Sequence, residues 1–149
     1  VDEHSLHTDG AGAGEYRGGS GAVRVYRSMN ENQTFTASFG RNKWPVWGAA
    51  GGKDGSVNYF QFIDADGTVS EPMGIAARRV MNTNDVVRMV TATGGGYGNP
   101  FKRPAEKVAM DVKNEFITVE QAKADYGVLV DPETFKVLGL TEERQKAEK

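Results

Sequence analysis

Glycine is concentrated in three clusters along this chain, and that pattern constrains the fold more than any other feature. Nineteen of the 149 residues are glycine, about twice the usual share. The clusters lie at residues 10–21, 48–55 and 94–98, where aromatic and charged residues interleave with them. This interleaving is not typical of a flexible low-complexity linker. The clusters instead predict tight turns and segments whose backbones approach one another closely.

Residues 1–99 have the pattern of β structure. Residues 33–39 alternate, with Phe35, Ala37 and Phe39 on one face, which is the period of a half-buried strand. Further strands are expected at residues 22–26, 57–63 and 86–90, which are bounded by glycine clusters or Asp-Gly turn signals. Strands at this spacing predict an antiparallel β-sandwich or a barrel-like sheet.

The pattern changes at Pro100, and residues 100–149 are expected to be mainly helical. Pro104 suits the first turn of a helix that continues to about Asn114. A short strand is expected at residues 135–138. The polar tail from Thr141 has the composition of a short helix or a frayed end.

A second helix is marked by its two ends. Thr118 and Gln121 have the spacing of a capping box, in which each side chain accepts a hydrogen bond from the other's backbone N–H. Gly127 is a natural C-terminal stop. The predicted fold is therefore mainly β with C-terminal helices (α+β): an antiparallel β-sandwich or barrel-like sheet followed by two or three short helices. We expect a single domain over residues 1–149, β-rich over 1–99 and helical over 100–149.

Charge and cysteine content exclude several classes of function. The 18 basic and 20 acidic residues nearly cancel, so neither nucleic acid nor a membrane is the expected partner. The chain has no cysteine, which excludes disulfides, thiolate metal sites and cysteine nucleophiles. The N-terminal residues lack the pattern of a signal peptide, and a cytoplasmic location is expected. His4 and His7 form either a metal-binding segment with neighbouring acids or an exposed polar stretch.

The familiar catalytic motifs are not present. The glycines of residues 94–98 are followed by Asn99-Pro100, so the lysine of a phosphate-binding Walker A loop is missing. No G-x-S-x-G elbow occurs. We therefore assign no catalytic residue and no metal ligand to this chain.

Three segments stand out as candidate sites. Arg17, Gly18 and Gly19 form either an anion-binding loop or a crossing between strands. Trp44 and Trp47 either close a core or anchor a partner. The third segment comprises Gly94, Gly95, Gly96, Tyr97 and Gly98. It is either a strand-to-helix turn or a substrate or interface loop. We expect its backbone to adopt conformations unsuited to other residues.

In this order, these segments resemble the C-terminal region of the hydantoinase B/oxoprolinase family. The matching motifs are Tyr16-Arg17-Gly18-Gly19, Arg24, Arg41 with Pro45-Val46-Trp47-Gly48, Gly51-Gly52, residues 93–100, Val119-Glu120-Gln121-Ala122 and residues 125–128. Each motif alone is moderately specific, whereas the ordered set is quite specific and covers nearly the whole chain. One departure is Asn99, where the family usually has Asp. A second is length, because family members usually have several hundred residues.

The resemblance implies an accessory role. It implies a small, separate subunit that completes the B-type fold in an ATP-dependent carboxylase of the acetophenone carboxylase type, which converts a ketone and bicarbonate to a β-keto acid. It also implies an obligate hetero-oligomer with hydantoinase A-like and hydantoinase B-like large subunits. No cofactor is expected on this chain, with Mg-ATP and a divalent metal assigned to the partners. The alternatives are a small part of an ATP-dependent hydantoinase or lactamase and, from another class, a free β-rich module that binds a small anion.

Overall fold

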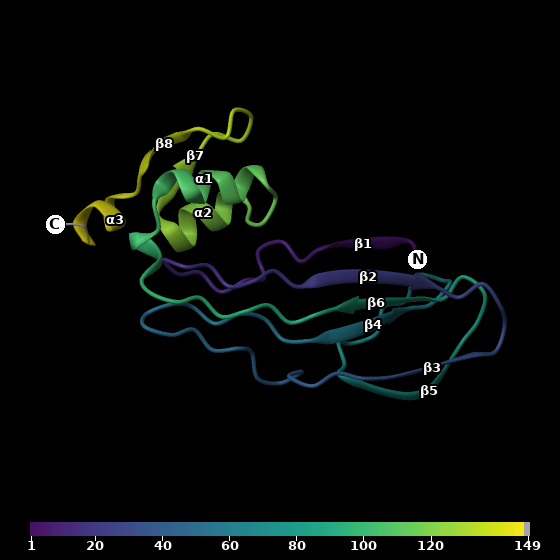
Figure 1. The fold of residues 1–149 in the computed structure, drawn as a ribbon. Coiled ribbons are helices and arrows are strands. Elements are labelled where there is room, and N and C mark those ends of the chain that lie inside the picture. Colours follow the sequence, from purple (N-terminus) through teal and green to yellow (C-terminus); the bar gives the residue numbers. More distant parts are fainter. Residues whose placement is uncertain (148–149) are drawn as a thin grey trace.

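The main sheet of the computed structural model, which describes residues 1–147, has four antiparallel strands (Figure 1). Their spatial order is β1-β2-β6-β4. The strands are β1 (Glu3–Leu6), β2 (Ala22–Arg27), β6 (Val86–Val90) and β4 (Tyr59–Ile63). The predicted strands at residues 22–26, 57–63 and 86–90 are thus confirmed within two residues at each end, and all three lie in one sheet.

A second, two-stranded sheet packs against β4 and β6. It pairs β3 (Gln33–Ser38) with β5 (Ile75–Met81). Phe35 contacts Phe60 and Phe62 edge to face, with ring centroids 5.7 and 5.4 Å apart. Phe35, Ala37 and Phe39 pack against this core, whereas the polar residues between them are exposed, which confirms the predicted alternation.

The two sheets form an antiparallel sandwich rather than a barrel. β1 and β4 are the edges of the four-stranded sheet, and no strand among residues 1–147 joins them to close the sheet. The barrel-like alternative is therefore wrong. Four strands of four to six residues leave the main sheet too narrow to curl back on itself, so the second sheet covers the Phe60 and Phe62 side chains instead.

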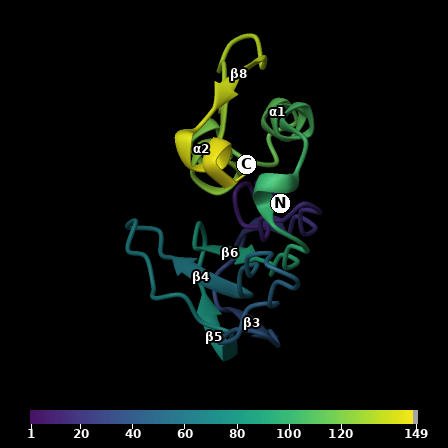
Figure 2. The same ribbon diagram turned by 90° about the vertical axis from the view of Figure 1, so that its left-hand side faces the viewer.

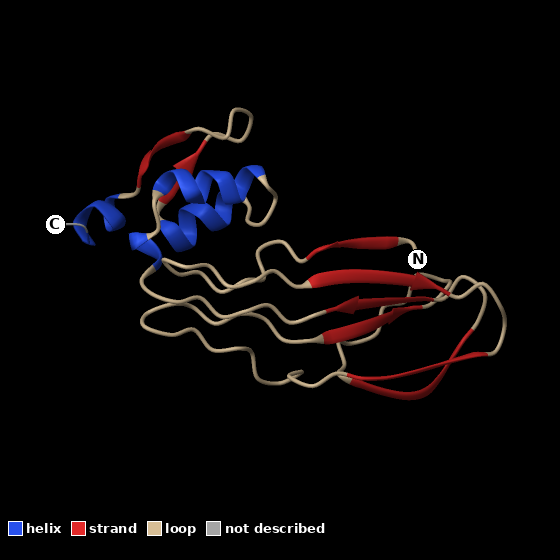
Figure 3. Cartoon of the chain, in the orientation of Figure 1, coloured by secondary structure: helices blue, strands red, loops and turns tan. Residues whose placement is uncertain are grey.

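The C-terminal part packs as a separate helical layer at one end of the strands (Figures 1 and 2). The helices lie over the glycine-rich loops, and they are drawn in blue in Figure 3. In chain order the elements are η1 (Pro100–Lys102), α1 (Ala105–Lys113), α2 (Val119–Tyr126), β7 (Val128–Val130), β8 (Val137–Leu140) and α3 (Glu142–Ala147). The predicted helices, the strand near residues 135–138 and the helical tail are present, although the strand lies two residues further along.

This layer has its own core. α1, α2 and β7 bury a common set of apolar side chains, with Ala13 of the first glycine cluster inserted among them. The buried residues are Ala13, Val108, Ala109, Val112, Ile117, Ala122, Tyr126, Val128 and Val130. No helix within residues 1–147 has the length and apolar character needed to cross a membrane.

Only half of the predicted capping box forms at α2. Thr118 Oγ1 accepts from the Gln121 backbone N–H at 3.1 Å, and Gly127 ends the helix with a left-handed φ of 63°, as expected. The prediction of the reciprocal bond, from the Thr118 N–H to the Gln121 side chain, is wrong. The Gln121 side chain donates to Asp125 instead, and the Thr118 N–H donates to Asp9 Oδ1 at 2.6 Å. An acid from a distant segment thus replaces the local partner.

Candidate functional site: the glycine array and its junction with the helices

Three glycine-rich segments lie side by side as extended chains; we call residues 10–21, 46–56 and 91–98 the glycine array. Backbone hydrogen bonds join the first segment to the third, from Gly12 N to Gly94 O at 2.9 Å. The third segment is bonded to the second from Gly96 N to Lys53 O and from Ala49 N to Gly96 O, each at 2.9 Å. These hydrogen bonds satisfy backbone N–H and C=O groups of the array, although the array lies outside the regular strands.

Several glycines of the array leave no room for a side chain. A Cβ atom on Gly95 would lie 2.2 Å from the Trp47 carbonyl oxygen, and one on Gly96 would lie 2.1 Å from the Ala13 oxygen. On Gly18 it would lie 2.0 Å from the oxygen of Gly94. The predicted close approach of backbones is therefore confirmed, and the approaching backbones belong to this same chain.

The backbone conformations in residues 94–98 differ from the expectation. Only Gly98 has a left-handed φ, at 78°. The expectation is wrong for Gly94, Gly95 and Gly96, because none of them has a positive φ; neighbouring backbone atoms crowd these positions instead, a nitrogen at Gly94 and carbonyl oxygens at Gly95 and Gly96. Tyr97 is exposed. The role of this segment as a substrate or interface loop stays a prediction.

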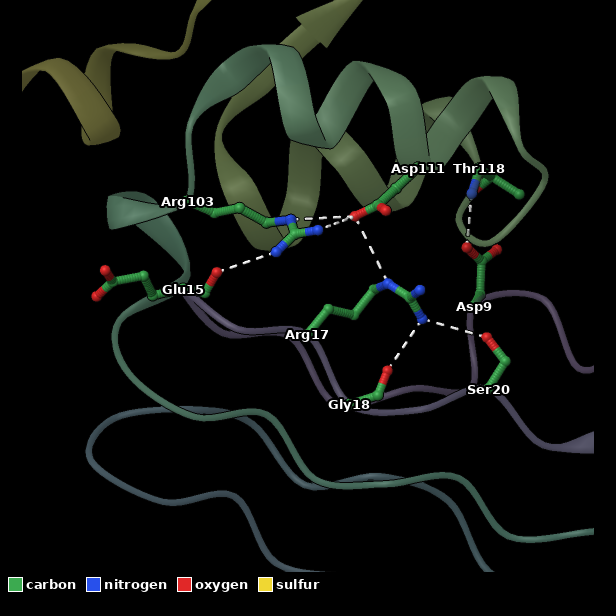
Figure 4. Close-up of polar contacts among 8 residues, drawn as sticks. All are labelled: Asp9, Glu15, Arg17, Gly18, Ser20, Arg103, Asp111 and Thr118. Carbon is green, nitrogen blue, oxygen red and sulfur yellow. Dashed lines mark hydrogen bonds and ion pairs between the residues drawn. The ribbon is translucent and has the colours of Figure 1, made fainter.

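Arg17 is held by partners within the protein (Figure 4). Its guanidinium donates to Gly18 O at 3.0 Å and to Ser20 Oγ at 3.2 Å, and its Nε lies 3.5 Å from Asp111 Oδ2. The guanidinium also lies 4.5 Å from the centroid of the Phe116 ring. An anion bound here competes with the Asp111 carboxylate, so the geometry favours a structural role. Anion binding by Arg17, Gly18 and Gly19 stays a prediction.

Asp111 joins the array to the helical layer. It accepts from Arg103 Nε at 3.0 Å and forms an ion pair with the same guanidinium at 2.8 Å. Arg103 also donates to the backbone oxygen of Glu15 at 3.0 Å. The Asp111 side chain is 9% exposed and those of Arg17 and Arg103 are 14% and 13% exposed. The sequence does not single out Asp111 or Arg103 as site residues. A single acidic residue on a predicted helix gives no indication that it pairs with a residue as distant in the sequence as Arg17.

Two further contacts bridge the same junction. Asp9 of the first glycine segment accepts from the Thr118 backbone N–H (Figure 4), and Lys53 of the second forms an ion pair with Asp125 of α2. Tyr126 lies buried behind them. Its hydroxyl has no hydrogen-bond partner among the described residues, and burial raises its pKa to about 12.

The two tryptophans lie on the surface. The exposed fraction is 80% for Trp44 and 75% for Trp47, so the core alternative is wrong for both. Their role as a partner interface stays a prediction. Tyr16 and Tyr97, which stand out in the sequence only within longer motifs, are also exposed at 63% and 58%.

The two histidines differ in their relation to this site: the His7 ring lies beside Gly10 of the array and its backbone N–H donates to Gly21 O at 2.9 Å, whereas His4 lies apart. His4 is on the exposed edge strand β1, where its Nε2 lies 3.4 Å from Arg24 Nε. Among residues 1–147, no cluster of three or more His, Cys, Asp or Glu residues has a geometry that holds a metal ion.

Known proteins resemble this chain in sequence and in fold. An uncharacterized protein of Methanocaldococcus jannaschii is 34% identical over 128 residues, 86% of this chain and 22% of the relative. The B component of a putative D-/L-hydantoinase from Pseudomonas sp. is 31% identical over 132 residues, 87% of this chain and 22% of the relative. The beta component of the caprolactamase from Pseudomonas jessenii is 31% identical over 147 residues, 88% of this chain and 23% of the relative.

Two solved structures superimpose on nearly the whole chain. The ATP-dependent caprolactamase of Pseudomonas jessenii has a TM-score of 0.79 at 29% identity, over 99% of this chain and 25% of the larger one. Nucleotide-free acetone carboxylase has a TM-score of 0.78 at 18% identity, over 97% of this chain and 23% of the larger one; at that identity it shows the fold alone. This chain thus spans about a quarter of the length of the proteins it matches. The family model of hydantoinase B/oxoprolinase matches residues 1–100, and the chain belongs to that family.

Proposed function

We propose that this chain works as a small accessory part of an ATP-dependent enzyme complex, in which it completes a hydantoinase B-type unit in the cytoplasm. The observation that carries the proposal is the likeness to components of ATP-dependent enzymes: the caprolactamase structure superimposes on 99% of this chain with a TM-score of 0.79. Several glycines of the array face closely packed backbone of this same chain. A role in shape and assembly fits these features better than a role in bond breaking.

The lead assignment for the complex is a carboxylase of the acetophenone carboxylase type. Such a complex joins a ketone and bicarbonate into a β-keto acid at the expense of ATP. Hydantoinase A-like and hydantoinase B-like large subunits are the proposed partners, and they supply the sites for Mg-ATP and for a divalent metal. The likeness of the fold to acetone carboxylase is compatible with this assignment.

A second assignment is an ATP-dependent enzyme that opens cyclic amides. The specific observation in its favour is the likeness to caprolactamase, at 31% identity in sequence and a TM-score of 0.79 in structure. The two assignments differ in the bond that is made or broken. They predict the same small accessory role for this chain.

Purification of the tagged chain from its source organism tests the shared proposal. We expect hydantoinase A-like and B-like chains to co-purify in a fixed ratio, read by native mass spectrometry. Incorporation of labelled bicarbonate into acetophenone, compared with ring opening of caprolactam or hydantoin, separates the two assignments when both are assayed with Mg-ATP. The isolated chain is expected to show no ATP turnover.

A free anion-binding module predicts a different outcome. The chain then purifies alone as a stable monomer, and phosphate or acetate shifts the amide resonances of residues 17–19 in a saturable way. This result, or steady ATP turnover by the homogeneous chain, contradicts the accessory role.

A further inference from the structure

Four large aromatic side chains are exposed on the three segments of the glycine array and the turn leading into it. We call Tyr16, Trp44, Trp47 and Tyr97 the aromatic surface; their exposed fractions run from 58% to 80%. No other aromatic residue within residues 1–147 is among the exposed large hydrophobic side chains. Isolated exposed apolar residues are ordinary, whereas aromatics gathered on neighbouring segments mark a binding surface.

The backbone beneath these side chains is fixed before any partner arrives. Tyr16 and Tyr97 face each other through two backbone hydrogen bonds, at 3.0 and 2.9 Å, and their ring centroids are 6.3 Å apart. The backbone N–H of Gly48, next to Trp47, donates to Asp54 Oδ1 at 2.8 Å. Because this frame is already ordered, binding through it costs little further conformational entropy.

Left-handed backbone conformations flank the two tryptophans. Arg41 has a φ of 52° and Ala50 a φ of 50°. Residues other than glycine, asparagine and aspartate rarely adopt this region. Such strain persists where the surrounding structure enforces it, and it gathers at functional segments. The segment that presents Trp44 and Trp47 is therefore bounded on both sides by a backbone conformation that these residue types rarely adopt.

The charge of this segment indicates the chemistry of its partner. Residues 39–52 contain Arg41 and Lys43 and no acidic residue. Both basic side chains are exposed. On the side of Trp44, an aromatic anchor beside two exposed basic side chains is complementary to a surface with an apolar pocket and acidic groups at its border.

We propose that the aromatic surface is the docking surface for the remainder of the hydantoinase B-type unit, a protein surface with apolar pockets and an acidic rim. This inference rests on the proposed function. It is supported by the larger relatives, in which a fold like this one makes up only 23–25% of the chain, so most of such a unit lies outside this fold. The formal net charge of −2 disfavours single-stranded nucleic acid, the other ligand that aromatic and basic residues suit.

The two tryptophans report directly on this surface, because they are the only ones in the chain. Protein labelled with 5-fluorotryptophan gives two fluorine resonances, which Trp44→Phe and Trp47→Phe assign. We expect both resonances to shift or broaden when the hydantoinase B-type chain from the same source is added. Trp47→Ala should raise the dissociation constant of the complex by at least about tenfold, as expected when a buried aromatic anchor is removed.

Matched variants on other surfaces serve as controls. Leu138 on β8 and Ile75 on β5 are exposed by 68% and 66%, and Leu138→Ala and Ile75→Ala should leave the dissociation constant within about twofold. A complex that forms with unshifted tryptophan resonances and unchanged affinity in Trp47→Ala overturns the docking surface but leaves the proposed function standing. No complex with the parent chain overturns both. Tighter binding of a single-stranded oligonucleotide than of the protein overturns the assigned occupant.

Discussion

Gly96 lies where two other segments of the array leave no space for a side chain. Carbonyl oxygens of Ala13 and Gly12 lie within 2.7 Å of the position of a Cβ atom. Gly19, in the same array, has no atom within 4 Å of that position. Neither residue is among the glycines with positive φ. At the scale of single residues, the array thus contains glycines that packing requires and glycines that it merely tolerates.

This difference predicts opposite results for two alanine variants. Gly96→Ala forces a backbone to move and should lower the free energy of unfolding by at least about 2 kcal/mol. Gly19→Ala fills open space and should change it by less than about 0.5 kcal/mol. Denaturant unfolding followed by circular dichroism measures both. Equal midpoints for the two variants would show that the array adjusts to a methyl group, contrary to the close packing of its backbones.

Tyr126 predicts a loss of stability in alkaline solution. Burial raises its pKa from 10.0 to about 12, so the folded state retains a proton that the unfolded chain releases. Its contribution is complete below pH 10.0 and is lost as the pH rises towards about 12. Tyr126→Phe should flatten the fall in melting temperature over this range, while Tyr97→Phe on the surface should leave it unchanged. An identical alkaline profile for parent and Tyr126→Phe would contradict this assignment.

At the scale of elements, local patterns located those strands that carry a clear signal. β3 alternates strictly, and β6, which is apolar except for Arg88, matches the expected residues 86–90. The sequence predicts none of β1, β5 and β7, and for β1 and β5 the reasons are physical. All four residues of β1 are exposed, so it has no buried face to leave a pattern. β5 contains Arg78 with a left-handed φ of 52° where its pairing with β3 shifts register, which breaks the period of two.

The candidate site likewise has features that the sequence predicts and features that it does not. Clustered glycines predicted close backbone packing, and the structure confirms it. The choice between core and surface for Trp44 and Trp47 depends on how segments fold back on one another, which composition does not determine. The Arg17–Asp111–Arg103 contacts were invisible for a related reason: single charged residues give no sign of which distant segment they meet.

The turn between β7 and β8 predicts a local response to acid. Asp131 Oδ1 accepts from the backbone N–H groups of Thr134 and Glu133 and from the Thr134 hydroxyl. Chiefly the Thr134 N–H, and then these other donors, lower the pKa of Asp131 below its ordinary value of 3.8. The stabilisation of the turn is therefore present above that ordinary value and is lost as the pH falls through the lowered pKa.

Carbon-detected NMR titration of the Asp131 carboxyl measures this pKa. Thr134→Val removes the hydroxyl donor but keeps the backbone donors, so we expect the Asp131 pKa to lie between that of the parent and the ordinary value. A titration midpoint at or above 3.8 in the parent protein would contradict the hydrogen bonding described for this turn.

At the scale of the whole molecule, the helical layer is attached to the sandwich through the glycine array. Ala13 enters the apolar core of the helices, and Asp9 accepts from Thr118 at the start of α2. Asp111 lies at the centre of this junction between Arg17 and Arg103 (Figure 4). Apolar packing and charged contacts therefore meet at one boundary between the two layers, and we expect them to couple the unfolding of the two.

Asp111→Asn tests this dependence, because the variant keeps the shape of the side chain and removes its charge. Two guanidinium groups would then be left largely buried without their carboxylate, and breaking a buried pair in this way costs about 3–5 kcal/mol. The matched control is Asp64→Asn, because Asp64 pairs with Arg79 at 2.9 Å on the surface, with both side chains at least 40% exposed. That pair should contribute less than about 1 kcal/mol. Unfolding in urea gives the two free energies, and hydrogen exchange should show faster exchange in α1 and α2 for Asp111→Asn alone. Equal, small losses in both variants would mean that apolar packing around Ala13, rather than the buried charges, holds the two layers together.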